Sequence, residues 1–196
     1  FHLDVLDGSP PCSVFSTAGV REEGWNTEKV FREGQAKQRL DDLFLYFIAI
    51  AKRLQPKVVI AENVKGIIIG NAKGWVNQIV KGFDDAGYDV QIFLFNAARM
   101  GVPQKRERVF FIAHRKDLKY PKLSMNFNSK PIPFRDVREP YGKAMDENSM
   151  QAKLLKYRIP TDRCIADINE RVRKVKNNGF STPINRDDEP IQTIVA

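Results

Sequence analysis

The pattern of apolar and polar positions predicts alternating strands and helices in the first 116 residues. Residues 2–6 alternate towards apolar side chains and end in Asp7-Gly8-Ser9-Pro10-Pro11, which is typical of a short strand closed by a turn. Over 36–54, apolar side chains recur at spacings of three and four, as on one face of an amphipathic helix. The β-branched run Lys57-Val58-Val59-Ile60-Ala61 predicts a buried parallel strand. The apolar positions farther along the chain predict a helix over 74–86 and strands over 88–95 and 108–113.

Strands separated by single helices form βαβ units, whose crossover is almost always right-handed. The expected fold class is therefore α/β, with residues 1–116 forming one domain around a sheet. The polar segment over 13–35 predicts a long loop, and loops of that length are commonly functional or mobile. After residue 116, prolines break the pattern into short pieces, so residues 117–196 are expected to form a second, irregular region.

Composition narrows the range of functions. The 196 residues are 42% hydrophobic, no apolar run approaches the roughly 20 residues that span a bilayer, and the first residues lack the basic start of a signal peptide. These features predict a cytoplasmic protein with no membrane partner. The two cysteines, Cys12 and Cys164, lie far apart and in no metal-ligand spacing, so we expect free thiols and no metal site. The net charge of +8 favours a polyanionic partner such as nucleic acid.

Two reactive side chains fall at the carboxyl ends of predicted strands, where an open α/β sheet binds its ligands. Cys12 follows the first strand, and Glu62 follows the strand predicted over 57–61. If these strands are neighbours, a right-handed crossover places both residues on one edge, because paired strands lie only about 4.8 Å apart. A thiolate that adds to C6 of cytosine makes C5 nucleophilic, and a carboxylic acid at N3 assists the addition. Arg106 and Arg108 precede the next strand and can supply the positive surroundings that ionise a thiol.

Each of these motifs alone has a commonplace structural interpretation. Pro10-Pro11-Cys12 is more often a turn with a packed thiol, Glu62-Asn63 a solvated loop, and 104–108 a charged turn. The occurrence of all three motifs, in order and each at a strand boundary, favours the chemical interpretation.

The same residues resemble the motifs of the DNA (cytosine-5) methyltransferases. Gly8-Ser9-Pro10-Pro11-Cys12, with Ser16 and Gly19, matches the nucleophile motif of that family, and Glu62-Asn63-Val64 matches its Glu-Asn-Val motif. Residues 96–108 resemble its Asn-Ala…Gly-Val-Pro-Gln-x-Arg-x-Arg segment. The match runs continuously over about residues 3–115, and the combination is highly specific. It implies the partial Rossmann-like sheet of an S-adenosylmethionine-dependent methyltransferase.

The resemblance also implies a role for each matching residue. The implied catalytic residues are Cys12 as the nucleophile, Glu62 on cytosine N3 and the exocyclic amine, Arg108 on the base oxygen and backbone, and Arg106 as support. Gln104 is implied to brace the loops around the cleft, and Ser16 with its loop to close over DNA. The cytosine must be flipped out, because a thiolate cannot reach C6 in a stacked duplex. Asn63 is expected to order the turn after the strand instead of touching the base.

Residues 117–196 are implied to belong largely to the target-recognition region of the family, and their mixed basic and aromatic content fits a DNA-reading surface. Candidate phosphate contacts in this region are Arg171, Arg173, Lys174 and Lys176. A solvated basic helix end is an equally good interpretation of any one of them. Duplex DNA is the implied partner, and an RNA-directed relative of the family is a weaker alternative.

The implied methyl donor is S-adenosylmethionine, but much of its site is expected to be absent from the sequence. The aromatic-x-Gly-x-Gly loop of the family should precede residue 1, and its final helix should follow residue 196. What remains of the donor site is at most Pro10, Pro11 and Leu43. We therefore expect a fragment, either one subunit of a split enzyme completed by an N-terminal segment or a DNA-binding remnant without catalysis.

Overall fold

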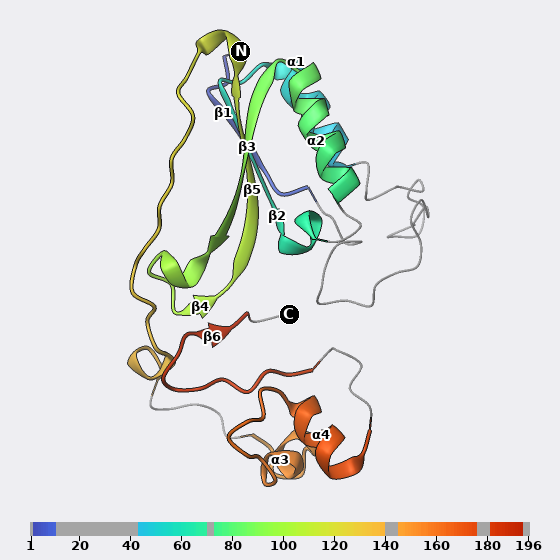
Figure 1. Cartoon of the computed structure of the whole chain (residues 1–196), viewed down its shortest axis with the longest axis vertical. Coiled ribbons are helices and arrows are strands. Elements are labelled where there is room, and N and C mark those ends of the chain that lie inside the picture. Colours follow the sequence, from blue (N-terminus) through green and yellow to red (C-terminus); the bar gives the residue numbers. More distant parts are fainter. Residues whose placement is uncertain (1, 11–42, 70–72, 140–144, 176–180, 194–196) are drawn as a thin grey trace. The chain divides into compact units, whose positions relative to one another are not determined.

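The computed structural model describes residues 2–10, 43–69, 73–139, 145–175 and 181–193 (Figure 1). The loop predicted over 13–35 and the beginning of the helix predicted over 36–54 lie outside the described residues.

A four-stranded mixed sheet forms the centre of the first part of the chain, with the strand order β1-β2-β5-β3. Its strands are β1 (Val5–Gly8), β2 (Val58–Val64), β3 (Tyr88–Asn96) and β5 (Glu107–Arg115). β1 pairs with β2 in parallel, as the predicted βαβ unit requires, whereas β5 runs antiparallel to both of its neighbours. The predicted α/β class is confirmed.

The sheet corrects three details of the prediction. The first strand, predicted over 2–6, lies over Val5–Gly8, so Asp7 and Gly8 belong to β1 and not to the turn. The strand predicted over 57–61 continues to Val64, so Glu62 and Asn63 lie within β2 and not after it. The reason is β5, which pairs with β2 residue by residue as far as Val64 opposite Arg108. β5 also lies between β2 and β3, so the two strands on either side of the second helix are not neighbours.

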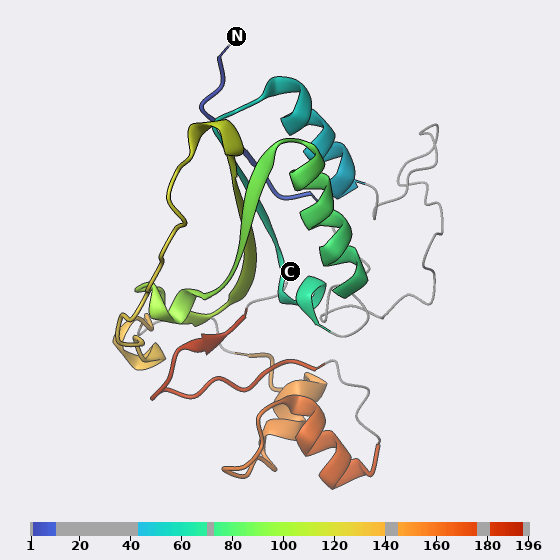
Figure 2. The same ribbon diagram turned by 45° about the horizontal axis from the view of Figure 1, so that its top comes forward.

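Two helices, α1 (Leu43–Leu54) and α2 (Lys73–Asp85), cover the same face of this sheet (Figures 1 and 2). Together with the strands they bury a core that includes Phe44, Ile48, Ala51, Val59, Ala61, Ile79, Phe83, Val109, Phe111 and Ala113. The rings of Phe44 and Phe111 meet edge to face with centroids 5.1 Å apart. Full burial of such a side chain stabilises a fold by about 1.5–3 kcal/mol, so this core holds the sheet and helices together.

The opposite face of the sheet carries no helix among the described residues. The extended segment after β5 runs along this face and contacts it. Gln91 exchanges two hydrogen bonds with the backbone of Leu123, at 3.1 and 2.7 Å. The ring of Phe127 packs edge-on against Phe95, with centroids 5.1 Å apart. This is the face from which Glu62 projects, because its partner across the ladder, Phe110, lies opposite Phe93.

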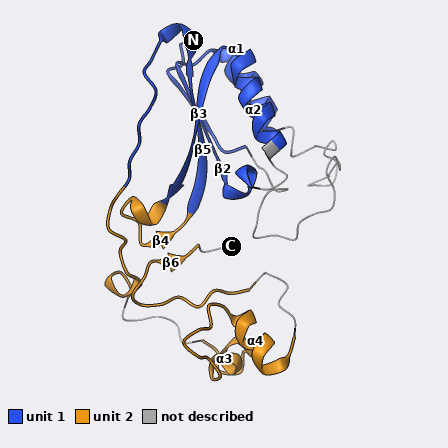
Figure 3. Ribbon diagram, viewed as in Figure 1, with its two compact units in different colours: residues 1–96, 107–127 blue, residues 97–106, 128–196 orange. Residues whose placement is uncertain are grey.

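The described contacts divide the chain into two units (Figure 3). Unit 1 comprises residues 1–96 and 107–127, and unit 2 comprises residues 97–106 and 128–196. Residues 97–106 therefore group with the C-terminal part, although the sequence analysis places the domain boundary after residue 116. The roles assigned to the two parts, catalysis and target recognition, stay predictions.

Unit 2 is built from short elements. β4 (Gln104–Lys105) pairs in parallel with β6 (Ile191–Gln192), and α3 (Met150–Leu155) packs beside α4 (Ile165–Arg173). Cys164, a free and half-buried thiol, is the N-cap of α4, where its backbone N–H donates to Asp167 at 3.0 Å. Short 3₁₀ turns of the two units occupy Lys65–Ile68, Ala97–Arg99, Lys116–Leu118 and Phe134–Asp136.

A membrane span is not found in the described part of the chain, where every helix is too short or too polar to cross a bilayer.

Candidate active site

Two donors hold the carboxylate of Glu62 on the helix-free face of the sheet. Nε of Arg108 lies 2.8 Å from Oε1, and the hydroxyl of Ser9 donates to Oε2 at 2.8 Å. Glu62 and Arg108 keep 29% and 21% of their side-chain surface exposed. The carboxylate therefore has a fixed position while it remains open to an incoming ligand.

Strand pairing explains why these three residues meet. Glu62 lies opposite Phe110, and Arg108 is two positions from Phe110 on β5, so both side chains project from one face. Ser9 follows β1 directly, and the parallel pairing of β1 with β2 sets Gly8 beside Ala61. The carboxyl ends of β1 and β2 therefore meet at one edge of the sheet, as the sequence predicted for these two strands.

Asn63 fixes the chain after β1 from the other face of the sheet. Its side chain is buried, its Nδ2 donates to the carbonyl of Pro10 at 3.1 Å, and its Oδ1 accepts the N–H of Val64 at 2.9 Å. Alternation along β2 turns this side chain away from Glu62. The ordering role predicted for Asn63 agrees with these contacts, although the residue acts from inside a strand and on a segment 53 positions away.

Gly8 allows α1 to approach the end of β1. A Cβ atom at this position would lie 2.5 Å from Cε2 of Phe47, which is closer than carbon atoms pack. The glycine of the motif therefore has a packing role immediately before Ser9 and Pro10.

Arg108 is engaged by neighbouring acceptors. Besides its ion pair with Glu62, its NH1 donates to the carbonyl of Glu107 at 2.8 Å, while the carboxylate of Glu107 pairs with Lys65 at 2.7 Å. Arg108 is predicted, together with Arg106, to make the surroundings of a thiol positive, and the ion pair with Glu62 offsets much of the charge of Arg108. The base contacts implied for Arg108 stay a prediction.

Three predicted site residues lie outside the described residues: Pro11, Cys12 and Ser16. Of the predicted donor contacts, Pro10 is buried and Leu43 is half-buried at the first position of α1. β1 ends and α1 begins at the same edge of the sheet, because α1 runs back between two parallel strands. Pro10 and Leu43 therefore belong to the edge at which β2 presents Glu62.

Gln104 and Arg106 belong to unit 2. Gln104 pairs with Ile191, and its carbonyl accepts the N–H of Arg106 at 3.0 Å. The carbonyl of Arg106 in turn accepts the N–H of Ala97 at 3.0 Å, which closes the segment 97–106 on itself. These bonds fix the two backbones within unit 2, and the side-chain roles implied by the resemblance stay predictions.

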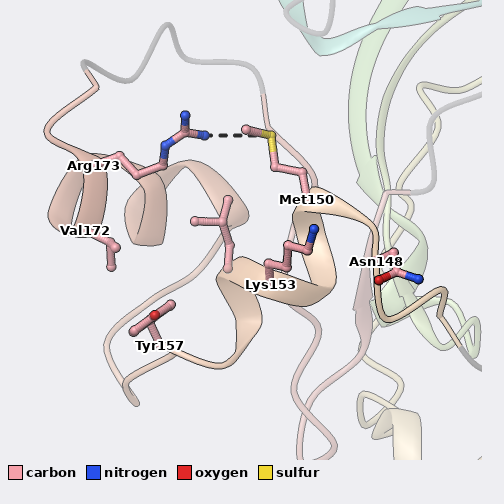
Figure 4. A pocket seen from close by; sticks show the side chains of 7 residues that line it. Asn148, Met150, Lys153, Tyr157, Val172 and Arg173 are labelled. Carbon is pink, nitrogen blue, oxygen red and sulfur yellow. Dashed lines mark hydrogen bonds between the residues drawn. The ribbon is translucent and has the colours of Figure 1, made fainter.

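The basic residues at the end of α4 differ in their availability. Arg171 donates to the buried carboxylate of Asp162 and to the carbonyl of Tyr157, both at 2.7 Å, which is a structural role that the sequence analysis missed. Arg173 is exposed, and its NH1 approaches the sulfur of Met150 at 3.9 Å beside a cavity of about 450 Å³ at α3 and α4 (Figure 4). Lys174 is also exposed, whereas Lys176 lies outside the described residues. The phosphate contacts predicted for these residues are untested.

Ser9 is the residue of the site to which sequence reasoning assigned no role. It stands within the motif around Cys12, but its partner Glu62 is 53 positions away and only the strand pairing reveals the contact. Lys65 was missed for a similar reason, since its partner Glu107 is 42 positions away.

Comparisons with known proteins identify the family of the chain. The model of the C-5 cytosine-specific DNA methylase family matches residues 1–190. The type II methyltransferase M.FnuDI of Fusobacterium nucleatum is 34% identical over 171 residues, which cover 85% of this chain and 44% of that protein. The type II methyltransferase M.NgoPII of Neisseria gonorrhoeae is 37% identical over 144 residues, which cover 69% of this chain and 38% of that protein.

A solved structure supports the same assignment. A prophage-encoded E. coli protein, described as a DNA modification methyltransferase, superposes with a TM-score of 0.53 at 25% identity, over 74% of this chain and 37% of that protein. The chain therefore spans less than half the length of each of these relatives. Because the family model matches nearly the whole chain, the chain belongs to the C-5 cytosine-specific DNA methylase family.

Proposed function

We propose that this chain carries the catalytic half of a DNA cytosine-5 methyltransferase, in which Cys12 attacks C6 of a flipped cytosine and Glu62 holds N3. Family membership supports the reaction class. The assignment of residues rests on two hydrogen bonds between the segment before Cys12 and β2. The hydroxyl of Ser9 donates to Glu62, and the side-chain amide of Asn63 donates to the carbonyl of Pro10.

These two bonds bear directly on the distance between nucleophile and carboxyl group. Cys12 follows Pro10 by two positions in the sequence, and two residues of extended chain span at most about 7 Å. The carbonyl of Pro10 is tied to Asn63, the neighbour of Glu62 on β2. The thiol of Cys12 is therefore close enough to contact the same cytosine base as the Glu62 carboxyl group, whose position is set by Arg108.

The reaction balances with these groups. The thiolate of Cys12 adds to C6, and the ring electrons move toward N3, where Glu62 supplies a hydrogen bond or a proton. C5 would then take a methyl group from a sulfonium donor, whose sulfur would keep the electron pair of the broken bond. Loss of the C5 proton to a base then restores the 5,6 double bond and expels the thiolate, and N3 returns any proton that it took to Glu62. Arg108 keeps the Glu62 carboxyl group in place during these steps, since its Nε holds Oε1 at 2.8 Å.

Base entry requires one of the two oxygens of Glu62 to change partner. Oε1 is bound by a guanidinium from the neighbouring strand, whereas Oε2 is bound by the hydroxyl of Ser9. A hydroxyl rotates with little cost, so we infer that N3 and the exocyclic amine of cytosine replace Ser9 at Oε2.

The methyl donor that fits this edge is S-adenosylmethionine, which supplies an electrophilic methyl group on a sulfonium. Leu43, half-buried at the start of α1, offers apolar surface beside the carboxyl end of β1, and Pro10 is held at the same edge through its carbonyl by Asn63. We infer that these two residues, with Pro11, border the donor.

A complementary segment that completes the donor site is also part of the proposal. Helix α1 exposes a second apolar stripe formed by Tyr46, Ile50 and Leu54, with exposed fractions of 64%, 49% and 42%. Among the described residues, β1 is an edge strand that pairs only with β2. A strand and helix added at this edge would cover both surfaces, and the relatives have at least as much additional chain as the match covers.

Duplex DNA is the proposed substrate, and the net charge of +8 favours its binding.

A duplex that contains 5-azacytosine tests the nucleophile, because the ring nitrogen makes C6 more electrophilic and a covalent adduct forms on addition. We expect the chain to form an adduct that survives denaturing electrophoresis and maps to Cys12. The Cys164→Ser variant should behave like the unmodified chain, and Cys12→Ser should form none. DNA binding without any adduct would favour the alternative, a DNA-binding chain without catalysis.

A further inference from the structure

We propose that a polar cavity within unit 2, of about 640 Å³, binds a backbone phosphate of DNA through Arg163 and Arg186. The cavity lies in the unit coloured orange in Figure 3, and its lining comes from the turn before α4 and from the chain around β4 and β6. The inference rests on the proposed function, because it names the part of unit 2 that the DNA substrate contacts.

Both acidic groups of the cavity are already neutralised. The carboxylate of Asp162 accepts from Arg171 at 2.7 Å and from the backbone N–H of Ile159 at 2.8 Å. The carboxylate of Glu189 pairs with Lys105, which also lines the cavity. Neither acid is therefore available to bind a further cation.

Two cationic side chains of the cavity have no such partner. Arg163 and Arg186 are exposed, and their guanidinium groups form no hydrogen bond or ion pair within the described residues. Asp167, which follows Arg163 on α4, uses its carboxylate on the backbone N–H groups of residues 163 and 164, at 2.8 and 3.0 Å. These backbone hydrogen bonds lower the pKa of the Asp167 carboxyl group, and the charge of Arg163 also helps to lower it. The cavity therefore presents two guanidinium groups whose donors have no acceptor among the described residues.

A phosphate group fits this arrangement better than other anions that the proposed function supplies. Guanidinium groups bind phosphate oxygens through paired, charge-assisted hydrogen bonds, which single lysines cannot form. The cavity also contains neutral donors, the hydroxyl of Thr161 and the amide of Gln192. Phosphodiesters are the anions that a DNA substrate presents at regular spacing, and contacts to them position a protein on the duplex.

Binding of the 196-residue chain to a fluorescein-labelled DNA duplex at several salt concentrations tests the proposal. Each phosphate neutralised contributes about 0.9 to the slope of log K against log salt. We expect the double variant Arg163→Gln/Arg186→Gln to lower that slope by about one or two and to weaken binding on the order of tenfold at low salt. The matched control is Arg158→Gln, an exposed arginine of unit 2 outside the cavity, which should keep the slope of the unmodified chain.

A second double variant distinguishes the effect of the two charges from the effect of the paired hydrogen bonds. Arg163→Lys/Arg186→Lys keeps both charges, so it should retain the slope while binding less tightly, because the paired hydrogen bonds are lost. An unchanged slope in the glutamine double variant would overturn the proposal, as would an equal loss in Arg158→Gln. Failure of the unmodified chain to bind any duplex would overturn the proposal and the proposed function together. A slope that depends on the cavity, without an adduct at Cys12, would leave the phosphate site in place and remove the catalytic function.

Discussion

Polar side chains in both units are held by partners from other elements of the fold. The hydroxyl of Tyr88 donates to the carbonyl of Pro56 at 2.7 Å, and the carboxylate of Asp162 is held by Arg171 nine positions later. Glu62 follows the same rule with Ser9 and Arg108. Such contacts fix the geometry of each unit, and single substitutions can test them.

Tyr88 should make stability depend on pH at the alkaline end. Burial raises the pKa of Tyr88 to about 12, against about 10 in an unfolded chain. The neutral phenol is favoured in the folded state, so its contribution is complete below pH 10 and is lost as the pH rises toward 12, by about 3 kcal/mol in total. Ultraviolet titration should find one of the five tyrosines ionising near pH 12, and Tyr88→Phe should remove that step. If all tyrosines of the folded chain titrate near pH 10, the burial of Tyr88 is wrong.

Arg171 should matter for the stability of unit 2. Asp162 keeps only 5% of its side-chain surface exposed, so Arg171→Gln leaves a nearly buried carboxylate without its cation. We expect the free energy of unfolding to fall by about 1–2 kcal/mol, measured by urea denaturation. Arg158→Gln is the control and should unfold like the unmodified chain. Equal unfolding midpoints for both variants would show that the Asp162 pair contributes nothing.

The sequence indicated which residues are chemically reactive, but it did not indicate which residues hold other side chains in place. Glu62 was predicted because it stands in a recognisable motif beside an apolar strand, and a single segment of the sequence is enough to reveal such a motif. Its catalytic role stays a prediction. Ser9 and Lys65 act through residues 53 and 42 positions away, so their roles follow from strand pairing. Arg171 looked like a free surface cation because local spacing does not show that Asp162 is buried.

Helices and strands were predicted well where the spacing of apolar residues is regular along the segment. α2, β3 and β5 lie within a few residues of their predicted bounds, and Gly87, with φ of +89°, closes α2 as a glycine in that position can. The central place of β5 was not predictable from its own residues, because an apolar strand has the same pattern between two neighbours as beside one. That place lengthens β2 through Glu62 and brings Arg108 to the carboxylate.

Helix α1 has two apolar sides, one buried in the core and one exposed. Ile48 is 5% exposed and packs in the core, whereas Ile50, two positions later, is 49% exposed on the other side. We expect Ile48→Ala to lower the free energy of unfolding by about 2–4 kcal/mol and Ile50→Ala by less than about 1 kcal/mol. Chemical denaturation of the two variants measures the difference. Equal losses would mean that the outer stripe is already covered in the isolated chain and is not available to a complementary segment.

At the scale of the whole molecule, the proposal divides the work between the two units. Unit 1 holds Glu62 at one edge of its sheet and bonds the segment before Cys12 to β2. The proposed role of unit 2 is to contact the DNA backbone through Arg163 and Arg186. Family membership alone leaves both assignments open, since the chain covers less than half of its relatives. The central claim is that Cys12 and Glu62 activate cytosine without help from the methyl donor.

Exchange of the hydrogen at cytosine C5 tests that claim most directly. Addition of a thiolate at C6 lets C5 take a proton from water, and elimination then releases the original hydrogen, so a duplex labelled with tritium at C5 should lose its label. We expect release with the unmodified chain and with Cys164→Ser, no release with Cys12→Ser, and a rate at least tenfold lower with Glu62→Gln, in line with the contribution of a positioned acid. Release that persists in Cys12→Ser, or its absence from the unmodified chain when DNA is bound, would contradict the account.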